Sequence, residues 1–182
     1  MILKTSHKED RWLLLGIPIL FLIGSLFHFL YQLSGSNFVV GAIAATNESV
    51  WEHNKMILVP VLSWWFFYYL CKRNVYRINR RSWFTGMLVS LISSLMLVPL
   101  LFYFYTNAFG IEYLLIDILI LFVALLFGQL LGLHIYHHSK GCPVWLSLLL
   151  SLLIILFFII FTYKTPHLPI FKDTTTNLYG IP

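Results

Sequence analysis

The sequence predicts an all-α integral membrane helical bundle of about five transmembrane helices, built as a single membrane domain over residues 1–182. Of the 182 residues, 59% are hydrophobic and 10% are charged, whereas soluble domains carry about 25% charged residues. The apolar residues also lie in long runs, and a run of about 18 residues is enough to cross the bilayer core as a helix. A third observation, the placement of the basic residues, predicts the orientation of the bundle.

The first span is expected at residues 12–33, after a basic N-terminal segment. A cleaved signal peptide is the alternative, because Ala42-Ile43-Ala44 resembles a cleavage site, but the polar residues 32–37 separate that site from the apolar run. The remaining spans are expected at residues 56–71, 83–105, 111–136 and 144–163, followed by an outer C-terminal tail at residues 164–182.

The apolar stretch at residues 38–45 precedes the second span and is too short to cross a core of about 30 Å as a helix. We expect it to re-enter the membrane or to lie at the membrane surface. It leads into the polar residues 46–55, the most polar segment between two spans on that side.

Nine of the twelve Lys and Arg residues lie in the N-terminal segment and in the loops at residues 72–81 and 137–143. Because basic residues accumulate in cytoplasmic loops, this asymmetry predicts an N-terminus inside the cell and a C-terminus outside. We therefore expect a multi-pass protein of the cell (cytoplasmic) membrane, in contact with the lipid bilayer. The net charge of +5 is explained by these loops, so no nucleic acid partner is expected.

Carboxylates and imidazoles gather on the expected outer side of the membrane. Those singled out, with one amide, are His28, Asn47, Glu48, Glu52, His53, Asp117, His167 and Asp173. They come from the first, second and fourth spans and from the tail, and the topology brings them to one level. We expect them to face one pocket that opens outward.

Two kinds of chemistry fit these side chains. Glu48 and Glu52 are spaced i,i+4 and would share one face of a helix. Imidazoles and carboxylates suit a divalent metal such as Zn²⁺, and Glu52, His53 and His167 are the expected ligands. The same groups suit acid–base chemistry, in which Glu48 or Asp117 is the expected general base. The expected substrate is a lipid-like or envelope molecule.

Structural explanations remain open for the same residues. Ser49 and Glu52 match a capping box that starts a helix, and Glu52 could pair with Lys55 at the surface. A functional role is the first hypothesis for Asp117, because placing an ionisable group within a span costs free energy. Alternatively, Asp117 could pair with a lysine of the outer side. His28 could be satisfied by a hydrogen bond to another helix.

Two other functions stay open beside the enzyme. A small transporter or ion-coupled carrier could exchange protons at Asp117 and Glu48, although polar residues deep in the spans are few. A structural or accessory membrane protein is the third possibility. On the expected inner side, four residues are also spaced as metal ligands can be: His134, His137, His138 and Cys142. A short loop that follows an aromatic helix end gives the same composition by chance.

The heptapeptide at residues 47–53, NESVWEH, resembles a motif of a bacterial family of small membrane proteins of unknown function. The tail segment PHLPIFKD at residues 166–173 and the closing Tyr179-Gly180-Ile181 resemble that family's C-terminal ending, and the resemblance covers nearly the whole chain. It implies a polytopic bacterial membrane protein in which both outer segments belong together. An acidic residue is expected where this chain has Gln32, so no role is assigned to position 32.

Overall fold

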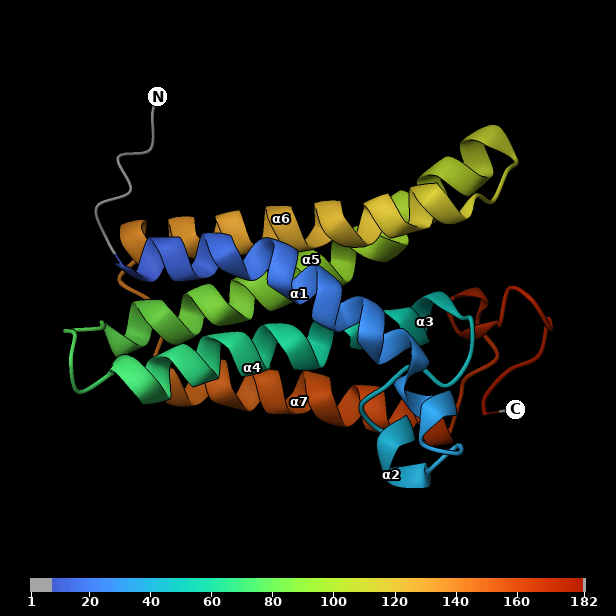
Figure 1. Ribbon diagram of the computed structural model, residues 1–182, viewed down its shortest axis with the longest axis horizontal. Coiled ribbons are helices and arrows are strands. Elements are labelled where there is room, and N and C mark those ends of the chain that lie inside the picture. Colours follow the sequence, from blue (N-terminus) through green and yellow to red (C-terminus); the bar gives the residue numbers. More distant parts are fainter. Residues whose placement is uncertain (1–7, 182) are drawn as a thin grey trace.

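The computed structural model describes residues 8–181, which are mostly helical and contain no β-strand. The only pairing of strand type within them is an isolated bridge between Lys172 and Tyr179. Five long helices run side by side (Figure 1): α1 (Lys8–Leu33), α4 (Lys55–Lys72), α5 (Arg80–Phe109), α6 (Leu114–His138) and α7 (Val144–Tyr163). Three short elements lie near one end of the bundle: α2 (Phe38–Gly41), α3 (Val50–His53) and the 3₁₀ helix η1 (Pro169–Phe171). The predicted all-α class is confirmed.

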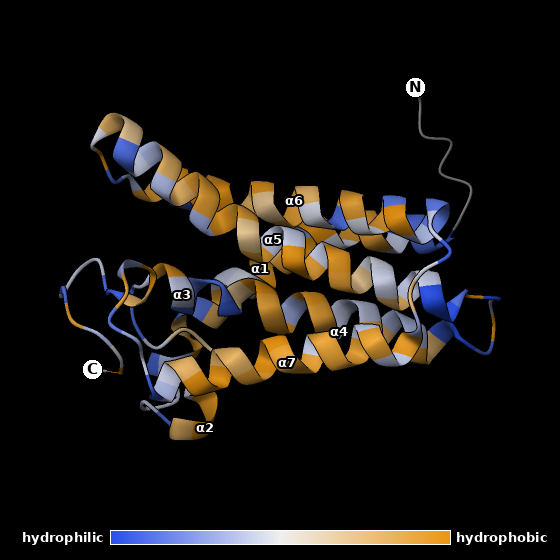
Figure 2. Cartoon of the chain, turned by 180° about the vertical axis from the view of Figure 1, so that it is seen from behind, coloured by the Kyte–Doolittle hydropathy of each residue, from blue (hydrophilic) through white to orange (hydrophobic). Residues whose placement is uncertain are grey.

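Four of the long helices, α1, α5, α6 and α7, are long and apolar enough to cross a membrane. Figure 2 shows hydrophobic residues along the helices and hydrophilic residues gathered toward the two ends. The remaining long helix, α4, has 18 residues and begins and ends on a lysine. A multi-pass membrane protein is therefore supported, whereas the fifth span and the orientation remain predictions.

Helix α4 lies against α1 and α5, and aromatic side chains fill both contacts. The rings of Trp12 and Trp64 stack at 4.1 Å between α1 and α4. One turn before His28, Gly24 allows α1 to approach α4 closely: a Cβ at this position would lie 2.6 Å from the backbone oxygen of Met56. Small residues at helix contacts are typical of membrane bundles. This close approach holds the C-terminal half of α1 beside the start of α4.

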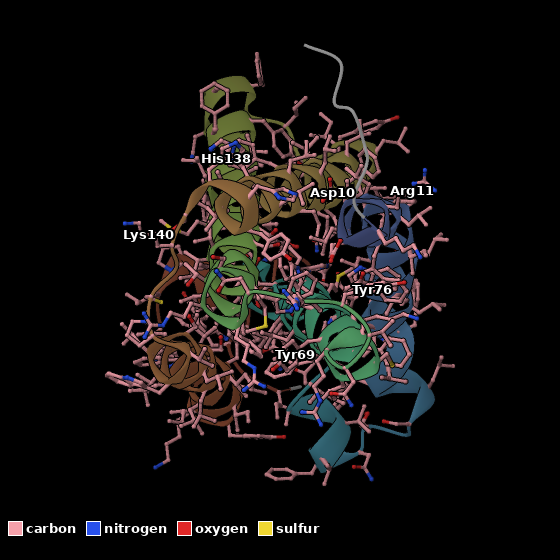
Figure 3. All side chains as sticks on the ribbon, turned by 90° about the vertical axis from the view of Figure 1, so that its left-hand side faces the viewer. Asp10, Arg11, Tyr69, Tyr76, His138 and Lys140 are labelled. Carbon is pink, nitrogen blue, oxygen red and sulfur yellow. The ribbon has the colours of Figure 1, made fainter. Side chains whose placement is uncertain are left out.

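The start of α1 and the loops at residues 73–79 and 139–143 form one end of the bundle. Figure 3 looks onto this end, where Arg11, Tyr76 and Lys140 lie. His137 Nε2 lies 2.6 Å from Asp10 Oδ1, which joins α6 to α1. Lys4, part of the basic segment expected inside the cell, is outside the described residues. Cys71 and Cys142 are free, so no disulfide joins them.

The opposite end contains α2, α3, η1 and the C-terminal tail (Figure 1). The short helix α2 corresponds to the stretch expected to re-enter the membrane or lie at its surface. It has a single turn, and the exposed fractions of Phe38 and Val39 are 69% and 73%. The Phe38 ring stacks on Tyr163 at the end of α7, at 4.2 Å between centroids. Whether this segment re-enters the membrane or lies at its surface stays a prediction.

Candidate functional site

Glu48 lies just before helix α3, and Ser49 caps that helix. The backbone of Ser49 is extended, and its side chain accepts a hydrogen bond of 3.3 Å from the Glu52 amide. The Ser49 amide donates to the side-chain oxygen of Asn47 rather than to Glu52. The helix therefore begins at Val50. Glu48 is outside it, and the expectation that Glu48 and Glu52 share one helical face is not met.

Glu52 points into the protein, where it is buried against four hydrogen-bond donors. Its carboxylate accepts bonds from Lys55 Nζ at 2.6 Å, from the amide and hydroxyl of Thr46, and from the Thr162 hydroxyl. Lys55 is fully buried and also donates to the carbonyls of Gly41 and Ala44. The expected Glu52–Lys55 pair exists, but it is buried and joins α4 to α7 and to the 41–46 segment. Its bonds leave Glu52 unsuited to bind a metal.

The Glu48 carboxylate lies between two imidazoles. Its Oε1 is 3.7 Å from His28 Nε2, and its Oε2 is 3.4 Å from His53 Nε2. The two rings stack with centroids 5.1 Å apart. Within the described part of the chain, these residues form the one group of three potential metal ligands whose ligand atoms lie within 4.8 Å of one another. We call His28, Glu48 and His53 the triad.

The hydrogen bond of His53 Nδ1 determines whether the ring nitrogen that faces Glu48, Nε2, carries a hydrogen. His53 Nδ1 lies 2.9 Å from the Ser49 carbonyl oxygen, which can only accept, so Nδ1 carries a hydrogen. In the neutral ring, Nε2 then directs a lone pair toward the carboxylate. Metal-bound histidines commonly donate their other N–H to a backbone carbonyl in this way. In a tetrahedral zinc site with bonds of 2.0–2.2 Å, two ligand atoms stand about 3.4 Å apart, close to the two carboxylate–imidazole distances of the triad, which involve different oxygens of Glu48.

Electrostatics couple Glu48 to His53. The hydrogen bond with His53 lowers the pKa of the Glu48 carboxyl, and burial opposes this shift. Burial lowers the pKa of His53, but the bonds to Glu48 and to the Ser49 carbonyl outweigh it, so the pKa of His53 is raised overall. The negative charge of Asp117 adds to this rise. Without a metal, the pair therefore favours a protonated His53 beside an ionised Glu48.

The triad lies in the wall of a cavity of ≈ 710 Å³ formed by α1, α3, α4, α5, α6 and the tail. Asp117, from the first turn of α6, lines the same cavity. Within residues 8–181 it pairs with no lysine: the Tyr105 hydroxyl donates to its Oδ1 at 2.6 Å, and the Tyr113 amide donates to that hydroxyl. The structure thus places Asp117, Glu48, His53 and His28 around one space.

The C-terminal tail holds the backbone around Glu48. Asp173 accepts from the Glu48 amide, and Asn47 donates from its side chain to the Gly180 carbonyl at 2.7 Å. Burial raises the pKa of Asp173, but hydrogen bonds from Thr176, Thr175 and Glu48 lower it well below its ordinary range. Asp173 is therefore an anchor of the tail, ionised at neutral pH.

The tail does not bring His167 to the triad. Its ring is exposed and packs against Tyr179 at 4.8 Å, and it lines a separate hollow of ≈ 340 Å³. The expected set of Glu52, His53 and His167 is thus not assembled. Instead, His28, which was expected only as a further polar residue of the pocket, lies beside Glu48 and His53.

A family model matches residues 1–181, and its description reads "Family of unknown function (DUF6512)". The chain belongs to this family. The match confirms the family resemblance noted from the sequence, and it assigns no activity. No curated protein and no solved structure matches the chain.

Some residues in or beside the cavity were not expected there from the sequence. Tyr105 precedes Asp117 by 12 residues across a short turn, and a tyrosine at a helix end reads equally well as an interface aromatic. Thr174 and Thr175 of the tail also line the cavity. A short turn between two expected spans could have pointed to the Tyr105–Asp117 pair, because it brings the facing ends of both helices together.

Proposed function

We propose that this protein is a membrane-embedded, divalent-metal-dependent enzyme that hydrolyses a lipid-like substrate at the outer face of the cell membrane. The single observation that carries the proposal is the triad in the wall of an otherwise mostly apolar cavity. The basic loops, taken as cytoplasmic, put that cavity on the outer side, and a fifth span at α4 completes the proposed topology.

His28, Glu48 and His53 would hold the metal and leave a coordination position open toward the cavity, as catalytic zinc sites with three protein ligands do. A bound metal of this kind lowers the pKa of water and polarises a carbonyl group. The Ser49 carbonyl fixes the His53 tautomer that has Nε2 free to bind. His28 belongs to α1, whereas Glu48 and His53 belong to the segment around α3, so the site forms only when α1 packs beside this segment.

Asp117 is the proposed general base. The Tyr105 hydroxyl occupies Oδ1, which orients the carboxylate and leaves Oδ2 to accept a proton. In hydrolysis of an ester or amide, the water oxygen bonds to the carbonyl carbon while Asp117 takes one water proton. The bond to the leaving oxygen or nitrogen then breaks, and Asp117 returns the proton to that atom.

A carrier is less well supported. Beyond the cavity, the bundle is filled by large buried side chains, with Trp65, Trp83 and Met87 fully buried. The hydrogen bond from Trp65 Nε1 to Gln129 Oε1 further ties α4 to α6 at this level. Polar residues that would carry an ion across the remaining depth of the bundle are scarce.

Metal analysis of the purified protein tests the proposal. After loading with Zn²⁺ or Mn²⁺ and removal of excess metal, wild type should retain about one ion per chain. His28→Ala and Glu48→Gln should retain less than a tenth of that amount. His167→Ala is the matched control, because it removes an imidazole outside the triad and should bind as wild type does. A wild type that retains no metal would overturn the proposal.

A further inference from the structure

We infer that the cavity beside the triad takes an amphiphile whose polar head carries no negative charge and whose hydrocarbon chain enters from the outer leaflet. This inference rests on the proposed function, because it names the substrate class of the same site. Three observations carry it: the apolar walls, the two kinds of exposed lining residues and the charges of the lining residues.

The walls of the cavity are apolar and belong to helices that are apolar enough to span a membrane. They are formed mainly by aromatic and branched side chains of α1, α5 and α6, among them Phe21, Phe29, Val98, Phe102, Ile118 and Leu121. The volume of ≈ 710 Å³ lies within the range of about 300–1,000 Å³ typical of ligand pockets. A hydrocarbon chain is the ligand that such walls solvate best.

The exposed residues that line the cavity are of two kinds. The exposed fractions of the apolar residues Phe29 on α1 and Leu114 on α6 are 53% and 72%, as expected of residues in contact with lipid tails. Glu112 and the tail residues Thr174 and Thr175 are polar and also exposed. In Figure 1 the far ends of α5 and α6 diverge from α1 and α3, and the cavity lies among these elements. An amphiphile would therefore lie with its head at the triad and its chain between α1 and α6.

The charges at the polar end select against an anionic head. Glu48, Glu112 and Asp117 all line the cavity, whereas none of the lining residues that the structure describes is Lys or Arg. The nearby Lys55 is fully buried and bonded to Glu52. Phosphate groups are usually bound by Arg, Lys or a free helix N-terminus. The N-terminus of α6 already carries Asp117 in its first turn, so it offers an anion no favourable site.

Photolabelling of the full-length protein in mild detergent tests this inference. Three probes would share one photoactivatable C12 chain and differ in their heads: a monoacylglycerol, a quaternary ammonium and a phosphate monoester. Labelling is measured on chelator-treated and on metal-loaded protein. We expect the first two probes to label residues of α1 and α6, and the phosphate probe to label at least tenfold less, most clearly without metal.

Two variants identify the site of labelling. Ile118→Trp fills the cavity from a half-exposed position and should reduce labelling at least fivefold. Leu152→Trp, on the exposed face of α7 away from the cavity, is the matched control and should label as wild type does. The double variant Glu112→Gln/Asp117→Asn should accept the phosphate probe better, which keeps the test decisive if Ile118→Trp fails to fold.

The outcomes separate the inference from the proposed function. Equal labelling by all three probes, or labelling unchanged in Ile118→Trp, would overturn the inference while metal binding could still stand. Selective labelling of a protein that retains no metal would leave the amphiphile site in place and remove the metal-dependent enzyme.

Discussion

The backbone amide of Glu48 donates a hydrogen bond of 3.0 Å to Asp173 Oδ2, although 125 residues separate the two in sequence. The Thr174 hydroxyl donates to the Glu48 carbonyl at 3.3 Å, so the tail holds both backbone groups of this residue. Glu48 precedes α3 and has no helical hydrogen bonds of its own to fix it. The position of its carboxylate between the two imidazoles therefore depends on the tail.

The first prediction concerns this anchor. Asp173→Asn removes the carboxylate that bonds Glu48, Thr175 and Thr176, so Glu48 should lose its fixed place. Loss of a residue that orients a metal ligand typically lowers affinity about 10–100-fold. Zinc affinity, measured by competition with a chromophoric chelator, should fall by that factor. Lys172→Ala removes the neighbouring side chain and is the control. Wild-type affinity in Asp173→Asn would show that Glu48 is held by other means.

The second prediction follows from the lowered pKa of Asp173. A carboxyl whose folded pKa lies below its unfolded value of about 3.9 stabilises the protein above that pH, and the contribution is lost as pH falls further toward the folded pKa. The difference in thermal stability between wild type and Asp173→Asn should therefore be constant from pH 5 to 7 and shrink below about pH 4. A difference that grows in acid would contradict this sign.

The third prediction concerns the buried pair of Glu52 and Lys55. Lys55→Met leaves an unpaired carboxylate in the interior and should destabilise the protein by about 3–5 kcal/mol, measured by denaturant titration in mild detergent. Glu52→Gln/Lys55→Met removes both charges and should recover much of this loss. Lys164→Met, at an exposed position, is the control and should change little. Metal content should stay at the wild-type level in the double variant, whereas a ligand role for Glu52 would abolish it.

The apolar runs in the sequence were sufficient to predict the long helices. The last expected span, residues 144–163, coincides with α7, because a helix that is apolar on all sides and bounded by polar residues has few alternatives. The same reasoning predicted the helix α4 at residues 56–71, although its lysine ends and aromatic content make it less apolar than the others. That α4 crosses the membrane, and the depth of the site residues in it, remain predictions.

The direction in which each site residue points was not predictable from the sequence. Glu48 and Glu52 point in different directions because the extended backbone of Ser49 lies between them. Only Glu52 belongs to the helix, so the i,i+4 spacing does not apply. His28 and His167 were both expected near the outer face, yet only His28 turns toward Glu48. Its direction depends on how closely α1 approaches α4 at Gly24, a packing detail that no local pattern encodes.

The last prediction concerns orientation, on which the outward-facing site depends. In a variant without native cysteines, single cysteines at Val75 and at Leu178 would lie at exposed positions at opposite ends of the bundle. A membrane-impermeant maleimide added to intact cells should label the cysteine at 178 and leave the one at 75 unlabelled until the cells are opened. Labelling of position 75 alone would invert the protein and put the cavity inside the cell. Labelling of both positions in intact cells would contradict three spans between them, so one of the helices α5, α6 and α7 would then not cross the membrane.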